Sequence, residues 1–148
     1  MMRSRRGRLL LAAGVVAFLV ISGVLARWLV LENVERDDIV LLLQAEARGD
    51  ARAMLAQLHG CDRYCMANVV RIAHRVRRAG TVLVLADSSR TAYSLTSAVG
   101  DTRVAWKAGT NPYPVVQCVK VKRSGNILSG LAITLLAVSA PIADTADC

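Results

Sequence analysis

The sequence predicts an α+β fold, in which an N-terminal transmembrane helix precedes helices packed on a curved antiparallel sheet of about five strands. Three observations lead to this prediction. An uncharged run covers residues 9–26, and apolar residues recur at three- and four-residue steps between residues 32 and 79. From residue 81 onward, β-rich segments alternate with turn residues. Helices followed by strands are typical of an α+β domain whose helices cover one face of the sheet.

The first 31 residues predict a cytoplasmic basic tail (1–8) and a transmembrane signal anchor (9–31). Arg3, Arg5, Arg6 and Arg8 precede the uncharged run, which as a helix would extend about 27 Å, close to the hydrocarbon thickness of a bilayer. Because basic flanks stay in the cytoplasm, we expect a single pass through the cell membrane and an extracytoplasmic α+β domain at 32–148. The alternative is a signal peptide cleaved after Val24-Leu25-Ala26, which would give a secreted protein.

Length and charge exclude several classes of protein. The chain has 148 residues, which allows one domain and excludes multidomain enzymes and long repeat arrays. The net charge is +8, but residues 1–31 contain five arginines and no acidic residue. The remainder therefore has the charge balance of an ordinary globular domain. A wholly basic nucleic-acid-binding protein is not indicated.

Residues 32–59 predict a helix in two parts. Asp37 or Asp38 can cap its start. Gly49-Asp50 is typical of a break, since glycine ends one helix and aspartate caps the next. Gly60 can end the second part. A further helix is expected at Ala67–Ala79, before Gly80.

The rest of the chain predicts a meander of strands. The expected strands are Thr81–Leu85, Thr91–Ser97, Thr102–Ala108, Val115–Arg123 and Ile127–Ser139. Turns are expected at 100–101 and 124–126 and a loop at 109–114. The uncharged segment 127–140 could form either a buried strand or a second membrane span. Its length as a helix, about 21 Å, is too short to cross a bilayer, so a buried central strand is favoured.

One short motif carries a resemblance to a known fold. Ala47-Arg48-Gly49-Asp50-Ala51 is followed by Met54-Leu55 and Leu58 in the first helical region. Together with the order of elements, this motif resembles the nuclear transport factor two-like (cystatin-like) fold over about residues 34–140. Versions with a membrane anchor are similar to bacterial Mce-associated proteins and to assembly proteins of conjugation machines.

The resemblance implies an extracytoplasmic scaffold or protein-interaction module without catalysis, with an unknown protein partner. The alternative is a small-molecule or lipid-binding module that uses the cone between sheet and helices. The fold also includes isomerases and dehydratases, but this chain matches none of their catalytic patterns. No catalytic residue and no cofactor are therefore assigned, and fold alone does not fix function. Asp87-Ser88-Ser89 is interpreted as a polar turn, because no base is paired with it.

All four cysteines, Cys61, Cys65, Cys118 and Cys148, lie in the expected extracytoplasmic part. An even number of cysteines there predicts disulfides, and three pairings exist. We expect Cys61–Cys65, which needs a tight turn, together with Cys118–Cys148, which closes a loop of about thirty residues and tethers the C-terminus.

A zinc site is the alternative for the first two cysteines. His59, Cys61, Cys65 and His74 lie within a short segment and offer two thiolates and two imidazoles. Their spacing matches no strong zinc pattern, and thiols outside the cell tend to oxidise. No metal is therefore expected, and His74 is interpreted as a helix-surface residue.

Arg71, Arg75 and Arg78 recur at i, i+4 and i+7, so they share one face of the expected helix. The simplest interpretation is a solvated face. The functional one is contact with anionic lipid or an acidic partner, where each basic group near a membrane contributes about 1 kcal/mol. No basic and aromatic stacking platform is present, so no nucleic acid is expected. Two interpretations exist for Trp106, Tyr93 and Tyr113: they line the concave face of the sheet, or they pack in the core, which is the favoured one.

Overall fold

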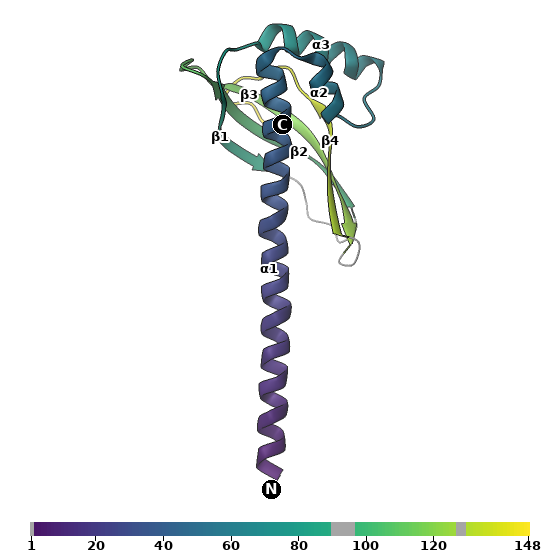
Figure 1. Cartoon of the computed structure of the whole chain (residues 1–148), viewed down its shortest axis with the longest axis vertical. Helices are drawn as coiled ribbons and strands as arrows, with labels where there is room; N and C mark the ends of the chain where they lie inside the picture. The colour runs from purple at the N-terminus through teal and green to yellow at the C-terminus, as the bar shows by residue number, and fades with distance from the viewer. Residues whose placement is uncertain (1, 90–96, 127–129) are drawn as a thin grey trace. The chain divides into compact units, whose positions relative to one another are not determined.

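The computed structural model describes residues 2–89, 97–126 and 130–148, and Figure 1 shows the helices and strands that they form. In these ranges the elements are, in chain order, α1 (Met2–Arg48), α2 (Ala51–Gln57), α3 (Arg63–Val76), β1 (Val82–Ser89), β2 (Ser97–Ala108), β3 (Val115–Asn126) and β4 (Gly130–Val138). The chain divides into two compact units, Met1–Val34 and Glu35–Cys148, and α1 contributes to both. Every contact described below lies within the second unit.

The N-terminal segment is helical, but the structure corrects its expected role. Residues 2–34 form the first part of α1, which continues without a break to Arg48. Over the ranges that the structure describes, no helix combines the length and apolar character needed to cross a bilayer. The prediction of an N-terminal transmembrane helix is therefore wrong. The uncharged run is one section of a longer helix, with basic residues before it and residues of both charges after it.

The predicted break between the first two helices is confirmed. Gly49 follows α1 with a φ of 73°, a conformation that costs glycine little. Asp50 caps α2, since its Oδ1 accepts a hydrogen bond of 2.9 Å from the backbone N–H of Ala53. Asp37 and Asp38 cap nothing, because both lie inside α1. A helix that is already formed propagates through such residues more easily than a new one starts.

The sheet is an antiparallel meander in the order β1-β2-β3-β4, with four strands in the described part of the chain rather than about five. The expected turn at residues 100–101 lies inside β2, where Gly100 pairs with Val121 and Asp101 with Lys120. Pairing with β3 keeps this segment extended in spite of the low β propensity of glycine and aspartate. Most of the expected strand Thr91–Ser97 lies outside the described residues.

The last strand lies at an edge of the sheet, not at its centre as predicted. Residues 130–138 of the segment weighed as a second membrane span are extended. Leu58 forms a bridge with Leu135, and the His59 N–H donates to the Leu135 carbonyl at 2.8 Å. The side-chain amide of Asn68 donates to the Val138 carbonyl at 3.3 Å. These contacts partly cover an edge that would otherwise be open to pairing with another chain.

The core lies between the helices and the inner face of the sheet. Alternate residues of β2 and β3 face inward and are buried: Thr102, Val104, Trp106, Ala108, Val115, Gln117, Val119, Val121 and Arg123. Leu42 of α1, Met54 of α2 and Ile72 of α3 pack in the same cluster and are fully buried. Trp106 is thus a core residue, as predicted. Tyr113 is not, since 75% of its surface is exposed, and Tyr93 lies outside the described residues.

Candidate functional site

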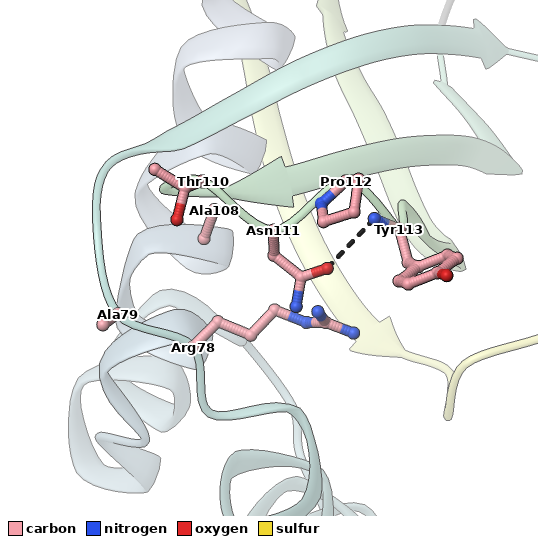
Figure 2. A pocket seen from close by; sticks show the side chains of 7 residues that line it. All are labelled: Arg78, Ala79, Ala108, Thr110, Asn111, Pro112 and Tyr113. Atoms are coloured by element: carbon pink, nitrogen blue, oxygen red, sulfur yellow. Dashed lines mark hydrogen bonds between the residues drawn. The ribbon is translucent and has the colours of Figure 1, made fainter.

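Two hollows lie beyond the C-terminal end of α3, and Arg78 lines both of them. The first has a volume of about 490 Å³ and is shown in Figure 2. It is lined by Arg78, Ala79, Ala108, Thr110, Asn111, Pro112 and Tyr113. The second has a volume of about 330 Å³ and is lined by Arg75, Val76, Arg78, Pro114, Val115, Val116, Ala140, Pro141 and Ile142. Both volumes are in the range of ligand sites. We call the two hollows together the Arg78 groove.

The loop between β2 and β3 forms one wall of the first hollow. Gly80 and Gly109 bring this loop close to the chain that follows α3, and a Cβ added to Gly80 would lie 2.5 Å from the Gly109 Cα. Within the loop, Asn111 Oδ1 accepts a hydrogen bond of 3.0 Å from the Tyr113 backbone N–H. This local turn is typical of asparagine. The position of the Asn111 amide is therefore set by the backbone.

Arg78 lies after the helix rather than on it, because α3 ends at Val76. Its backbone N–H donates to the Ala47 carbonyl at 2.8 Å, which fixes it against the end of α1. The prediction that Arg78 shares a helix face with Arg71 and Arg75 is therefore wrong. The structure brings Arg75 and Arg78 together in the second hollow, whereas Arg71 is exposed on α3 and lines neither hollow.

The charged side chains that line the groove are all positive. None of the residues that line either hollow is acidic. The Arg78 Nε is buried, and it has no hydrogen-bond partner in the part of the chain that the structure describes. A recess lined by one sign of charge, with low-dielectric walls, attracts groups of the opposite sign. The Arg78 groove can therefore hold an anionic group.

A second polar feature, centred on Glu46, is buried in the core. Gln117 Nε2 donates to Glu46 Oε1 at 2.7 Å and to the Ser139 carbonyl at 3.0 Å, and the Trp106 indole N–H donates to Gln117 Oε1 at 2.7 Å. Glu46 is fully buried, and its Oε2 has no hydrogen-bond partner among the described residues. Burial raises the pKa of Glu46 from 4.5 to about 7, against the opposing effect of the Gln117 hydrogen bond.

A carboxyl group with a pKa near 7 suits proton transfer in a catalytic site. Glu46 nevertheless lines neither hollow and has no exposed surface, so its position suits a structural role. Sequence reasoning missed this residue, although a signal exists. Glu46 continues the helical spacing of Ile39, Leu42 and Leu43, which places it on the buried face.

A buried ion pair connects the start of the second unit to the sheet. Arg123 donates through Nε and Nη2 to Glu35 Oε2, with an Nε distance of 2.7 Å, and Thr102 Oγ1 donates to Glu35 Oε1 at 2.7 Å. Arg123 Nη2 also donates to Ser89 Oγ at 2.8 Å. This group joins α1 to β1, β2 and β3. Sequence reasoning missed it too, since only the fold brings residues so distant in the chain together.

The two expected disulfides are present. Cys61–Cys65 joins Cα atoms 5.2 Å apart, and Cys118–Cys148 joins Cα atoms 5.6 Å apart. Cys61 precedes α3, and Asp62 caps that helix through a hydrogen bond of 2.8 Å from the Cys65 N–H. The first disulfide therefore spans a helix start, where the chain turns tightly enough to close it.

This disulfide contains both cysteines of the alternative zinc site, so neither is available as a thiolate ligand. Nowhere in the described ranges does a cluster of potential ligands suit a metal ion.

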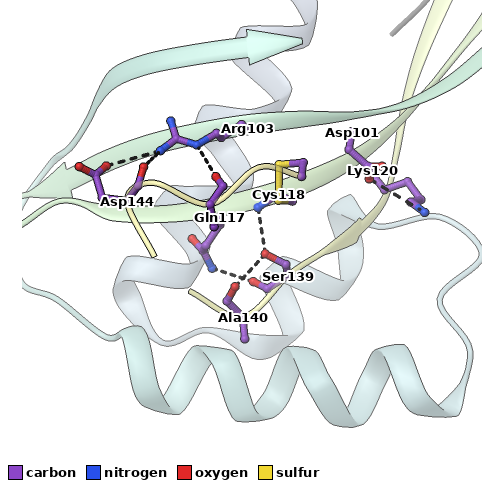
Figure 3. Close-up of a disulfide and its surroundings, with 10 residues drawn as sticks. Asp101, Arg103, Gln117, Cys118, Lys120, Ser139, Ala140 and Asp144 are labelled. Carbon is purple, nitrogen blue, oxygen red and sulfur yellow. Dashed lines mark hydrogen bonds and ion pairs between the residues drawn. A yellow bond between two sulfur atoms is a disulfide. The ribbon is translucent and has the colours of Figure 1, made fainter. Parts of the chain in front are cut away.

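The second disulfide holds the C-terminal tail against the outer face of the sheet, as Figure 3 shows. Arg103 donates through Nε to the Ala146 carbonyl at 3.1 Å and pairs with Asp144 at 3.5 Å. Nearer the groove, the Ile142 N–H donates to the Val116 carbonyl at 2.8 Å. These contacts position residues 140–142, which form one wall of the second hollow.

No family model, characterised protein or solved structure matches this chain. The resemblance to the nuclear transport factor two-like fold therefore stays a prediction. Function is inferred from the side chains that the fold brings together.

Proposed function

We propose that this protein is a non-catalytic interaction module that works outside the cytoplasm and binds an acidic segment of a partner protein. The observation that carries the proposal is the Arg78 groove. Arg78 lines both of its hollows, Arg75 lines the second, and no acidic side chain of the lining neutralises them. Complementary charge gives such an interface its specificity and speeds the encounter with its partner.

The disulfides support a compartment outside the cytoplasm. All four cysteines are paired, and stable disulfides are rare in the reducing cytoplasm. Cys118–Cys148 also restrains the tail that contributes Pro141 and Ile142 to the groove. The groove therefore depends on a disulfide, and the disulfide needs an oxidising compartment.

A partner protein has more support than a small molecule or lipid held in the cone between sheet and helices. Trp106, Leu42 and Met54 are fully buried in that space, where a ligand would need open volume. The surface of an anionic bilayer is a weaker candidate as well. Arg71 and Arg75 are exposed and could meet it, but Arg78 is half-buried, so a flat bilayer surface reaches less of it than a peptide segment that follows both hollows.

A titration with two matched peptides tests the proposal. The full-length, ¹⁵N-labelled protein would be kept in a non-ionic detergent, which covers the exposed apolar side chains of residues 10–25. The probes are the blocked peptide acetyl-EGEGEG-amide and its uncharged counterpart acetyl-QGQGQG-amide. We expect the acidic peptide alone to shift the amide signals of residues 75–79 and 110–114. Equal shifts with both peptides, or none with either, would refute the proposal.

The compartment is tested separately in cells that produce the protein. Thiols are trapped with acid at the moment of lysis and then alkylated. We expect none of the four cysteines to be alkylated without prior reduction. Four alkylated cysteines would contradict a location outside the cytoplasm.

A further inference from the structure

Resting on the proposed function, we infer that the Arg78 groove anchors a single carboxylate, the acidic side chain of an extended peptide. The carboxylate lies between the Arg78 guanidinium and the side-chain amide of Asn111. An apolar neighbour in the same peptide occupies the second hollow.

The two donors converge in the first hollow. Asn111 uses its Oδ1 to accept the Tyr113 N–H, which leaves its Nδ2 free to face elsewhere, and Figure 2 shows Nδ2 directed toward the Arg78 side chain. The buried Arg78 Nε has no hydrogen-bond partner within the described part of the chain. A carboxylate accepts through two oxygens and can satisfy both donors at once.

The second hollow determines which kind of side chain lies beside the acidic residue in the bound peptide. Apart from Arg75 and Arg78, its lining is apolar: Val76, Pro114, Val115, Val116, Ala140, Pro141 and Ile142. An aliphatic side chain buried there gains stability by leaving water. At the opposite rim, Tyr113 is largely exposed and can pack on the backbone of a bound chain. A peptide with one acidic and one aliphatic residue matches both hollows, whereas free phosphate matches only the first.

Asn111→Asp is a sharp test because it changes almost nothing except charge. The new carboxylate keeps an oxygen that accepts the Tyr113 N–H, so the turn is preserved. It also removes the amide donor and places a negative charge beside Arg78. Arg78→Gln removes the other donor. Arg71→Gln is the matched control, because it deletes an exposed arginine of α3 that lines neither hollow.

The probes are acetyl-LGEGL-amide and acetyl-LGQGL-amide, titrated into the full-length protein by NMR at two salt concentrations. A hydrogen bond to a charged group contributes enough for its loss to weaken binding about tenfold or more. We therefore expect Asn111→Asp and Arg78→Gln to lose at least about tenfold in affinity for the glutamate peptide, and Arg71→Gln to lose less than about twofold. The glutamine peptide should bind weakly to all four proteins.

Two outcomes would overturn the anchor and leave the proposed function standing. One is peptide binding that Asn111→Asp does not weaken. The other is equal weakening by Arg71→Gln, which would indicate a diffuse charged surface. Failure of the wild-type protein to distinguish the glutamate from the glutamine peptide would refute both the anchor and the proposed function.

Binding to vesicles of phosphatidylglycerol and phosphatidylcholine is measured as a further comparison. Vesicle binding that depends on Arg78 and Asn111, without peptide binding, would assign the site to lipid and overturn the inference. Thermal melting checks that each variant is folded.

Discussion

Replacing Glu46 with glutamine should stabilise the protein at neutral pH but not at acid pH. Glu46 is fully buried, its Oε2 has no partner among the described residues, and burial raises its pKa to about 7. At neutral pH the folded protein therefore carries either a buried charge or a proton that the unfolded chain would release. Glutamine at this position stays neutral at every pH, and its Oε1 can still accept the Gln117 hydrogen bond.

The magnitude follows from the two pKa values of Glu46. In the unfolded chain the pKa takes its ordinary value of 4.5. Between this value and about 7 the folded state binds more protons than the unfolded state, so stability falls as pH rises. Each pKa unit corresponds to about 1.4 kcal/mol. The wild-type protein should thus lose about 3 kcal/mol from this group between pH 4.5 and pH values above 7, and Glu46→Gln should recover that amount only at the upper end.

Urea unfolding of the full-length, oxidised protein, followed by circular dichroism from pH 4.5 upward, measures this difference. We expect the wild type and Glu46→Gln to unfold at similar urea concentrations at pH 4.5 and to separate steadily as pH rises. Asp87→Asn, which removes an exposed carboxyl of β1, is the control and should follow the wild type. A stability difference between the wild type and Glu46→Gln that is the same at every pH, or that shrinks as pH rises, would refute the reasoning.

Three further perturbations test other parts of the fold. Converting Cys118 and Cys148 to serine should lower the free energy of unfolding by about 3–4 kcal/mol, because the disulfide closes a long loop; an unchanged urea midpoint would contradict this. Gly80→Ala should lower the melting temperature more than Gly60→Ala, since both have positive φ but only the first would clash with backbone; equal melting temperatures would argue against that close approach. Glu35→Gln should cost about 3–5 kcal/mol in urea unfolding by removing the carboxylate charge that faces the buried Arg123 guanidinium, and a loss below about 1 kcal/mol would contradict a buried ion pair.

Local signals in the sequence predicted local structure well. Gly49-Asp50 combines a residue that tolerates positive φ with a capping side chain, and the chain breaks between helices there. The expected cysteine pairing is also present, and the tight turn that Cys61–Cys65 needs is supplied by the start of α3. β3 begins at Val115, as predicted, whereas β1 continues through the segment Asp87-Ser88-Ser89 that was interpreted as a polar turn.

Features that depend on tertiary contacts were predicted poorly. Gly100-Asp101 has the composition of a turn, yet pairing with β3 keeps it in a strand. The N-terminal run has the composition of a membrane span, yet it forms part of a helix that continues to Arg48. At the candidate site, Arg75 and Arg78 were identified from their spacing. Asn111 was not, because its role depends on how the loop after β2 meets the end of α3.

The central claim is that the Arg78 groove holds an acidic segment of a partner protein. The most direct measurement is photo-crosslinking in living cells with a photoreactive amino acid in place of Tyr113, which lies exposed on the rim of the groove. Mass spectrometry then maps the crosslinked peptide. The account predicts a crosslink to a segment that contains Asp or Glu, lost when Arg78→Gln is added and retained with Arg71→Gln. A crosslink to a segment without acidic residues, or one that persists in Arg78→Gln, would contradict it.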